Sequence, residues 1–240
     1  MVENGGRGGA LREALFAFAA TTAIAAVLWQ ARGLLGDFLH LGIAALFLLA
    51  PRWLLDRRRA DWADYGLTAR PVGRGAAVAL LAALVVFPPF LAGFVGYYDA
   101  ACGAGLMPSL CRRWLGWSGA AFALPPGFAS LALGQIVVVA LPEEFFYRGY
   151  LQGRLAEVWP NRWKVLGAPV GPALLASAAL FGVAHVLVDF DPRRLATFFP
   201  ALVFGWMRQA TGSVLAPTLF HAMCNLYIDA LHESFFGAAR

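Results

Sequence analysis

The chain has 240 residues, of which 60% are hydrophobic and only 14% are charged. A soluble domain of this length carries roughly 25% charged residues, so the composition excludes a globular protein with a water-exposed surface and predicts a polytopic membrane protein. The formal net charge of +5 at pH 7 requires no nucleic-acid partner, because the basic residues of membrane proteins collect in their cytoplasmic loops. The expected partner is the lipid bilayer.

Seven segments are long and apolar enough to be membrane-spanning helices, which need about 20 mostly apolar residues. They lie at 14–31, 37–55, 76–97, 127–150, 169–188, 195–210 and 213–236. The second and the sixth are short or interrupted by polar residues, so we expect about seven spans within a range of six to eight. No polar linker of useful length separates them. The expected fold is therefore an all-α transmembrane helix bundle in one integrated domain.

The loops on the two sides of these spans differ in positive charge. One side collects Arg7, Arg12, Arg52, Arg57, Arg58, Arg59, Arg70, Arg74, Arg154, Arg162, Lys164 and Arg208. The other side holds Arg32, Arg112, Arg113, Arg193, Arg194 and Arg240. Because lysine and arginine are enriched in cytoplasmic loops, the richer side predicts a cytoplasmic N-terminus.

Three cysteines are too few for a disulfide framework. Cys102 and Cys111 share one loop and are able to pair if that loop faces an oxidising compartment. Cys224 lies in an apolar segment, where a free cysteine is expected as a small core residue.

Ionisable residues inside membrane segments are the strongest indication of function, because each costs about 2.5–3.5 kcal/mol on insertion scales. The polar residues found within the predicted spans are Glu143, Glu144 and Arg148 in the fourth, His185 in the fifth, and His221 and Asn225 in the seventh. His40 in the second span and Asp229 in the seventh are weaker candidates.

The two adjacent acids of the fourth span are expected to have different roles. Glu144 and Arg148 are four residues apart with the acid first, the favourable order for an ion pair on one helix face. Glu143 lies about 100° around the helix, so Arg148 cannot readily serve both acids. A desolvated carboxylate without a partner is suited to take and return protons. The alternative is that Arg148 extends to the cytoplasmic interface and both acids lie close to water.

The histidines admit two readings. A single histidine within a membrane is commonly a hydrogen-bonded packing residue, but here two accompany an amide and an unpaired acid. One hypothesis is a site that activates water, formed by Glu143, His185, His221 and Asn225. In it the Asn225 amide donates to an oxyanion. Glu143 and the two histidines could equally hold zinc, or the site could work without a metal. The zinc signature H-E-x-x-H and the nucleophile elbow G-x-S-x-G are absent from the sequence.

At these residues the sequence resembles the CAAX-processing and bacteriocin-processing (CPBP, or Abi) family of intramembrane proteases. The pattern of that family is E-E-x-x-x-R, then F-x-x-x-H, then H-x-x-x-N or H-x-x-x-B. The chain has "EEFFYRG", "FGVAH" and "HAMCN" in that order, and the glycine after the arginine also resembles the family. The resemblance covers about 125–230, within a catalytic helix core expected at 121–240. The preceding helices and loops, 1–120, resemble the family only as membrane segments.

The resemblance implies peptide-bond hydrolysis inside the membrane. It implies that Glu143 activates the water, that Glu144 with Arg148 holds the site in shape, that the two histidines orient the water or a metal, and that Asn225 stabilises the oxyanion. Eukaryotic members remove the last three residues of prenylated proteins, whereas bacterial relatives include bacteriocin-immunity and maturation proteins and some that process C-terminal sorting tails. No feature of the sequence points to a prenylated substrate, and the Arg- and Ala-rich composition is typical of a high-GC bacterium. We therefore expect maturation or tail processing of a membrane-associated protein or peptide in a bacterial inner membrane.

Two other classes of protein stay open. The polar cluster could be a recognition cavity in a non-catalytic immunity or binding protein, although the intact motifs argue against this. Acids and histidines within a membrane also mark transporters and proton relays, although the sequence shows no repeated half-helices of the transporter type.

The predicted span boundaries conflict with a shared site. At a rise of about 1.5 Å per residue, Glu143 and His185 each lie roughly 24 Å along spans that cross in opposite directions. They can meet only if the fourth helix extends past Tyr150, to about Leu155, or if the fifth begins deep in the membrane or tilts.

Overall fold

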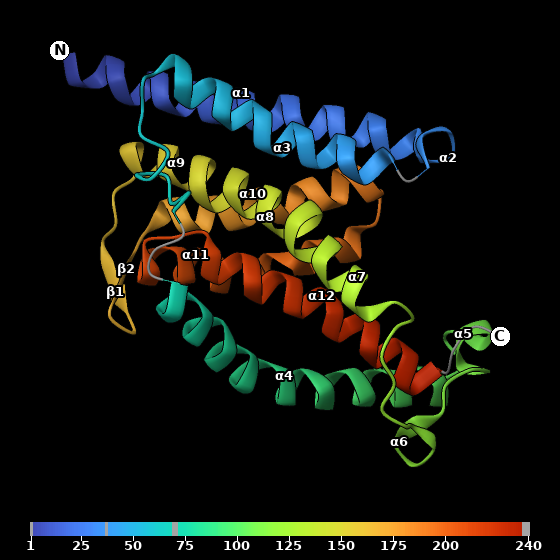
Figure 1. Cartoon of the computed structure of the whole chain (residues 1–240). Coiled ribbons are helices and arrows are strands. Elements are labelled where there is room, and N and C mark those ends of the chain that lie inside the picture. Colours follow the sequence, from blue (N-terminus) through green and yellow to red (C-terminus); the bar gives the residue numbers. More distant parts are fainter. Residues whose placement is uncertain (1, 37, 69–71, 237–240) are drawn as a thin grey trace.

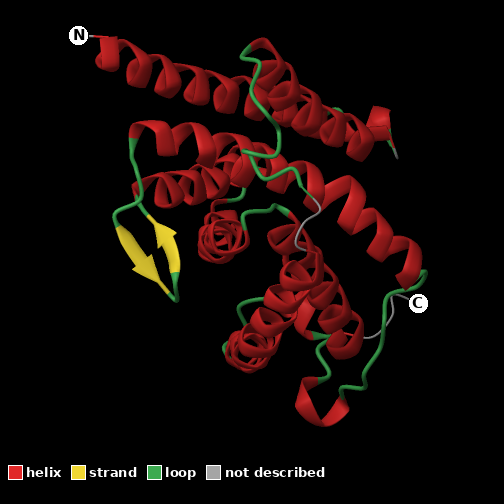
Figure 2. Ribbon diagram, turned by 60° about the vertical axis from the view of Figure 1, so that its left-hand side comes forward, coloured by secondary structure: helices red, strands yellow, loops and turns green. Residues whose placement is uncertain are grey.

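The structure is a computed structural model of the whole chain and describes residues 2–36, 38–68 and 72–236. Nearly all the regular structure in these residues is helical, and a single two-stranded sheet accompanies the helices there (Figure 2). The predicted all-α class is therefore confirmed.

Two of the charges used to predict the orientation, Arg70 and Arg240, lie outside the described residues.

Five of the described helices are long and apolar enough to cross a membrane. They are Gly6–Gln30 within α1 (Val2–Gln30), α3 (Phe38–Arg57), α4 (Val72–Gly103), the continuous segment Phe128–Val158, and α10 (Pro172–Asp189). These five correspond to the first five predicted spans. The last two predicted spans are also helical, as α11 (Phe198–Thr211) and α12 (Leu215–Phe236), although α11 has only 14 residues.

The helices form a bundle with two outer edges, shown in Figure 1. Along one edge, α1 and α3 pack against each other and are joined through the short α2 (Arg32–Leu35). The opposite edge is α4, which packs against α12 and leads into α5 (Pro108–Cys111) and α6 (Gly116–Gly119). The segment Phe128–Val158, α10 and α11 lie between these edges, so the polar residues of the sequence motifs fall inside the bundle.

The fourth membrane helix changes its winding along its length. It consists of α7 (Phe128–Gly134), the π-helical η1 (Gln135–Ala140), α8 (Leu141–Glu144), the π-helical η2 (Phe145–Leu151) and α9 (Gln152–Val158). The predicted boundary at residue 150 is therefore wrong. The helix ends only where Trp159 adopts an extended conformation before Pro160, because a proline disfavours helical geometry in the preceding residue.

The longer helix removes the conflict between the two halves of the predicted site. Glu143 lies close to the middle of the 31-residue segment Phe128–Val158 instead of at its end. His185 lies in the last third of the 18-residue α10. The two side chains consequently line one cavity.

A β-hairpin, which the sequence analysis did not predict, connects the fourth helix to α10. It pairs β1 (Trp163–Val165) with β2 (Ala168–Val170) in antiparallel register. Its two turn residues, Leu166 and Gly167, have φ angles of 48° and 80°, as required at both central positions of a type I′ hairpin turn. The indole Nε1 of Trp206 donates to the carbonyl oxygen of Val165 at 2.8 Å and holds the hairpin against α11.

The cysteines behave differently from one another. Cys102, at the end of α4, forms a disulfide with Cys111, a pairing that the sequence analysis left open. Cys224 is free and partly buried. It packs against the core cluster that contains Phe204 and Phe220, as predicted, and it also lines the cavity.

A buried arginine joins α1 to the end of the fourth helix. Arg154, predicted to lie in a cytoplasmic loop, is part of α9 and fully buried. Its Nε donates to Glu13 Oε1 at 3.1 Å, and its Nη1 is ion-paired with Glu157. The Tyr150 hydroxyl donates to the same Glu13 oxygen at 3.0 Å, and Arg58 reaches the other oxygen at 3.0 Å. This compensation explains how α9 continues the helix past the polar residues at which the predicted span stopped.

Glu13→Gln is expected to weaken the packing of α1, because it leaves the buried Arg154 with Glu157 as its one anionic partner among the described residues. We expect the free energy of unfolding to fall by about 2 kcal/mol, below the full cost of breaking a buried pair because Glu13 is partly exposed. Thermal unfolding in detergent measures this. Arg52→Gln, which breaks an exposed pair with Asp56, is the control and should cost under about 1 kcal/mol. Equal effects would contradict the role of Arg154.

Candidate active site

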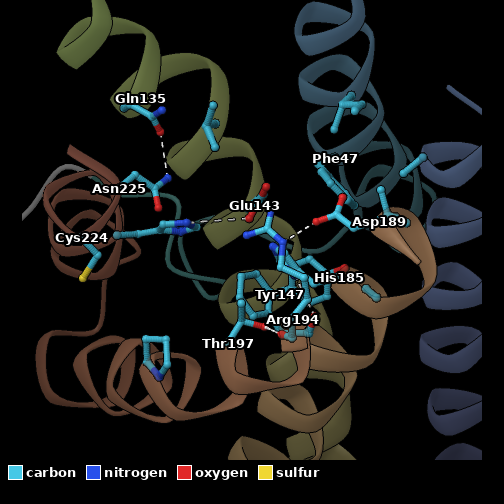
Figure 3. Close-up of a pocket in the computed structure, with 18 of the residues that line it drawn as sticks. Phe47, Gln135, Glu143, Tyr147, His185, Asp189, Arg194, Thr197, Cys224 and Asn225 are labelled. Carbon is cyan, nitrogen blue, oxygen red and sulfur yellow. Dashed lines mark hydrogen bonds and ion pairs between the residues drawn. The ribbon is translucent and has the colours of Figure 1, made fainter. Parts of the chain in front are cut away.

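A cavity of about 470 Å³ lies between the fourth helix, the ends of α1 and α10, the first halves of α3 and α11, and the middle of α12 (Figure 3). Four of the residues selected from the sequence line it: Glu143, His185, His221 and Asn225. The other two, Glu144 and Arg148, are buried behind its wall. The weaker candidates His40 and Asp229 also line the cavity. The fold thus gathers residues from four of the predicted spans around one space.

The winding of the fourth helix separates its two adjacent acids. Glu143 and Glu144 end the short α8, which stands between the π-helical segments η1 and η2. Such π-helical turns are rare and occur frequently at functional sites. The Glu144 side chain is 0% exposed, whereas 16% of the Glu143 side chain is exposed. The two carboxylates therefore meet different surroundings although they are neighbours in the sequence.

Glu144 is held by two charged or ionisable groups. Its Oε1 accepts from Arg148 Nη1 at 2.9 Å and from His221 Nδ1 at 2.8 Å. The predicted ion pair between Glu144 and Arg148 is therefore confirmed. The alternative, in which Arg148 extends to the membrane interface, is wrong, because this side chain is only 1% exposed.

Aromatic rings complete the surroundings of Arg148. Its guanidinium carbon lies 4.2 Å from the ring centroid of Phe181 and 4.9 Å from that of Phe204. The negative faces of aromatic rings attract cations, most strongly where water is excluded. Phe181, the first residue of the second sequence motif, thus contributes to holding the charge inside the bundle.

Glu143 has a different position in the cavity. Its Oε2 lies 3.9 Å from His221 Nε2, beyond hydrogen-bonding distance. This oxygen is buried and has no hydrogen-bond partner among the described residues. Because buried polar atoms nearly always have partners, a buried carboxylate oxygen left unpaired in a cavity indicates a site for a polar reactant.

Both histidines are bonded to the protein through Nδ1 and leave Nε2 free. His221 Nδ1 contacts the Glu144 carboxylate, and His185 Nδ1 lies 2.9 Å from the carbonyl oxygen of Phe181. These oxygens can only accept, so Nδ1 carries the proton in each ring, and Nε2 of the neutral ring is left as an acceptor. Ring contacts hold the imidazoles further: Phe204 stacks on His221 with 4.9 Å between ring centroids, and Phe181 lies at a tilt to His185 with 4.3 Å between centroids.

Asn225 is oriented by a residue that the sequence analysis did not select. Its Nδ2 donates to Gln135 Oε1 at 2.8 Å, as Figure 3 shows. Gln135 begins η1 and is the one amide in the uncharged run from Phe128 to Leu141. That isolated polar side chain was the signal that could have revealed it. Because one of its two N–H groups is engaged in this way, Asn225 retains the other as a donor.

The glycine of the first motif has a packing role. A Cβ added at Gly149 would lie 2.8 Å from the carbonyl oxygen of Tyr65. No side chain fits there unless the loop after α3 moves. Gly149 therefore allows η2 to pass close to this loop.

Among the described residues, no group of three His, Cys, Asp or Glu side chains is placed to hold a metal ion. Nδ1 of each histidine is bonded to a protein oxygen, which leaves Nε2 free in both rings, an arrangement that zinc-binding histidines also show. The use of a metal therefore stays a prediction, and we derive no step through one.

The fold and the cavity together define a helical membrane protein with a buried carboxylate–histidine site. Residues 125–227 match the model of the family described as "Type II CAAX prenyl endopeptidase Rce1-like". This range contains all six of the selected site residues and confirms the resemblance to the CAAX-processing proteases. This part of the chain is therefore similar to the CAAX endopeptidase family of membrane proteases. No curated protein and no solved structure matches the chain.

Neutralising each acid in turn should separate their roles. Glu144→Gln is expected to lower the free energy of unfolding by about 3 kcal/mol, because it leaves the charge of Arg148 buried without its carboxylate. Glu143→Gln should change it by under about 1 kcal/mol, because no described residue hydrogen-bonds to its buried oxygen. Thermal unfolding of both variants in the same detergent measures the difference. A larger loss for Glu143→Gln would contradict the assignment.

Proposed function

We propose that this protein is an intramembrane endopeptidase in which Glu143 activates a water molecule to hydrolyse a peptide bond of a membrane-associated protein or peptide. The observation that carries the proposal is the contrast between two adjacent acids. Glu144 Oε1 accepts from Arg148 and His221, and its other oxygen, which has no partner among the described residues, belongs to a fully buried side chain that does not line the cavity. Glu143 has an unpaired oxygen in the cavity, 3.9 Å from His221 Nε2.

The chemistry proceeds in two steps. Glu143 takes a proton from water, and the resulting hydroxide attacks the carbonyl carbon of the scissile peptide. The Glu143 carboxylic acid then returns the proton to the leaving nitrogen as the C–N bond breaks. The second hydrogen of the water is donated to the Nε2 atom of His221 or of His185, which orients the water. The free N–H of Asn225 donates to the oxyanion of the tetrahedral intermediate.

The buried pair supports this chemistry indirectly. The Glu144 carboxylate fixes the tautomer of His221, just as the carboxylate of a catalytic triad orients its histidine. Gln135 holds Asn225 in the same manner. We assign Glu144 and Arg148 positioning roles, because they are bonded to each other and do not line the cavity. We assign Gln135 the same role, because it orients Asn225. The route is drawn without a metal.

We further infer that the cavity faces the outside of the cell. It extends from Glu143 toward Trp29, His40 and Asp189, at the end of α1, the start of α3 and the end of α10. This is also the side on which α4 ends at the Cys102–Cys111 disulfide. Disulfides persist in oxidising compartments, while the arginines at the end of α3 on the other side favour the cytoplasm. Both observations support a cytoplasmic N-terminus in a bacterial inner membrane.

This orientation bears on the substrate. A cavity open to the outside is suited to the exported ends of membrane-associated proteins, and therefore to maturation or C-terminal tail processing. Prenylated proteins carry their modified ends on the cytoplasmic side, where this cavity would not receive them. We therefore do not extend the prenyl substrate in the family description to this chain.

Cleavage of a membrane peptide in liposomes tests the proposed activity. Glu143→Gln and His221→Ala should each lower kcat by at least about 100-fold, as expected for loss of a general base or of the group that orients its water. Cys224→Ser, which alters another cavity residue, should cleave like the wild type. Cleavage by both Glu143→Gln and His221→Ala at the wild-type rate would exclude the mechanism. Loss of activity with a chelator, restored by zinc, would replace it with a metal-assisted one.

Selective labelling tests the orientation. In spheroplasts, a membrane-impermeant reductant followed by an impermeant maleimide should label Cys102 and Cys111, because both are expected outside. A single cysteine placed at Arg58, in a chain whose natural cysteines are replaced by serine, should react only after lysis. Labelling in the reverse order would show that the cavity faces the cytoplasm.

A further inference from the structure

The cavity contains a cation that the proposed chemistry does not use. The charged residues that line it are Glu143, Asp189, Arg194 and Asp229, so Arg194 is the one lysine or arginine among the described lining residues. Arg194 belongs to η3 (Pro192–Thr197), the 3-10 turn that follows α10. The sequence analysis treated it only as a loop charge.

The backbone and the side chain of Arg194 are both held in place. Its N–H donates to the carbonyl oxygen of Asp191 at 3.0 Å, and its carbonyl accepts from the Thr197 hydroxyl at 2.8 Å. Its Nε is ion-paired with Asp189. In Figure 3 the side chain rises from the turn toward Asp189 with its head group at the level of Glu143. The cation is thus fixed at one face of the cavity.

Asp189 engages only part of the guanidinium. No described residue accepts a hydrogen bond from the two terminal nitrogens of Arg194. The side chain is half exposed, so these nitrogens are open to a molecule that enters the cavity. The planar arginine head group binds carboxylates through two parallel hydrogen bonds, which gives both affinity and a defined orientation.

We propose that Arg194 binds a carboxylate of the substrate and thereby sets which peptides enter the site. This inference rests on the proposed peptidase function. The carboxylate can be the C-terminus of the substrate or the side chain of an acidic residue. Asp189 lies one helical turn beyond His185, a rise of about 6 Å. The bound carboxylate is therefore expected within a few residues of the scissile bond.

The neighbouring arginine provides a matched control. Arg193 is fully engaged by Asp191, which accepts from its Nε at 3.0 Å and from its Nη2 at 2.8 Å. Its side chain is 82% exposed and does not line the cavity. Arg193→Gln therefore removes the same charge from the same turn without affecting the proposed contact.

Three versions of one synthetic membrane peptide test the proposal. The first has a free C-terminal carboxylate and no acidic side chain, the second a C-terminal amide and no acidic side chain, and the third an amide and one glutamate near the cleaved bond. For the wild type, the second peptide should show a KM about tenfold higher than the better of the other two, with a similar kcat. Which of the two binds better identifies the source of the carboxylate.

In Arg194→Gln the three KM values should become equal, and Arg194→Lys should restore part of the preference. Arg193→Gln should retain it. A preference that survives in Arg194→Gln would overturn the inference, and so would an equal fall in kcat for all three peptides, which would place Arg194 in the chemical step. Binding of the same peptides to the Glu143→Gln variant is measured by titration, and the ratio of their Kd values gives the carboxylate preference without any cleavage. The binding preference can therefore be tested even if the protein has no peptidase activity.

Discussion

A guanidinium and a carboxylate remain ionised inside a membrane bundle only when each compensates the charge of the other. Removing either ion from water costs several kcal/mol, which their mutual attraction offsets in part. Arg148 Nη1 is paired with Glu144, and the guanidinium lies against Phe181 and Phe204. Its Nη2 and the Oε2 of Glu144 have no hydrogen-bond partner among the described residues. The positions of α10 and α11 around the fourth helix depend on this group, because the two rings beneath the guanidinium belong to those helices.

His221 connects the stabilising pair to the proposed chemistry. One ring nitrogen contacts the engaged acid Glu144, and the other faces the unpaired acid Glu143. A single imidazole therefore transmits the orientation set by the buried pair to the atom that meets the reactant. The π-helical segments on either side of α8 set the direction of the two acids, which directly follow Pro142.

Part of this arrangement was predictable from the sequence, because it depends on local periodicity. Apolar runs revealed the long helices, and the four-residue spacing revealed the pair of Glu144 with Arg148. The end of the fourth helix was not predictable, because Arg154 is buried through contacts with Glu13, far away in the chain. Gln135 and Arg194 acquire their roles only from the packing of separate helices, which hydrophobic periodicity does not encode. The π-helical winding has no sequence signature of its own.

The central claim is that Glu144 and Arg148 are present because each compensates the other, and a double-mutant cycle tests it most directly. The melting temperatures of Glu144→Gln, Arg148→Met and the double variant are measured in one detergent. The account predicts that the double variant is more stable than either single variant, with a coupling of about 2–3 kcal/mol, because it leaves no uncompensated buried charge. Losses of stability that simply add would contradict it.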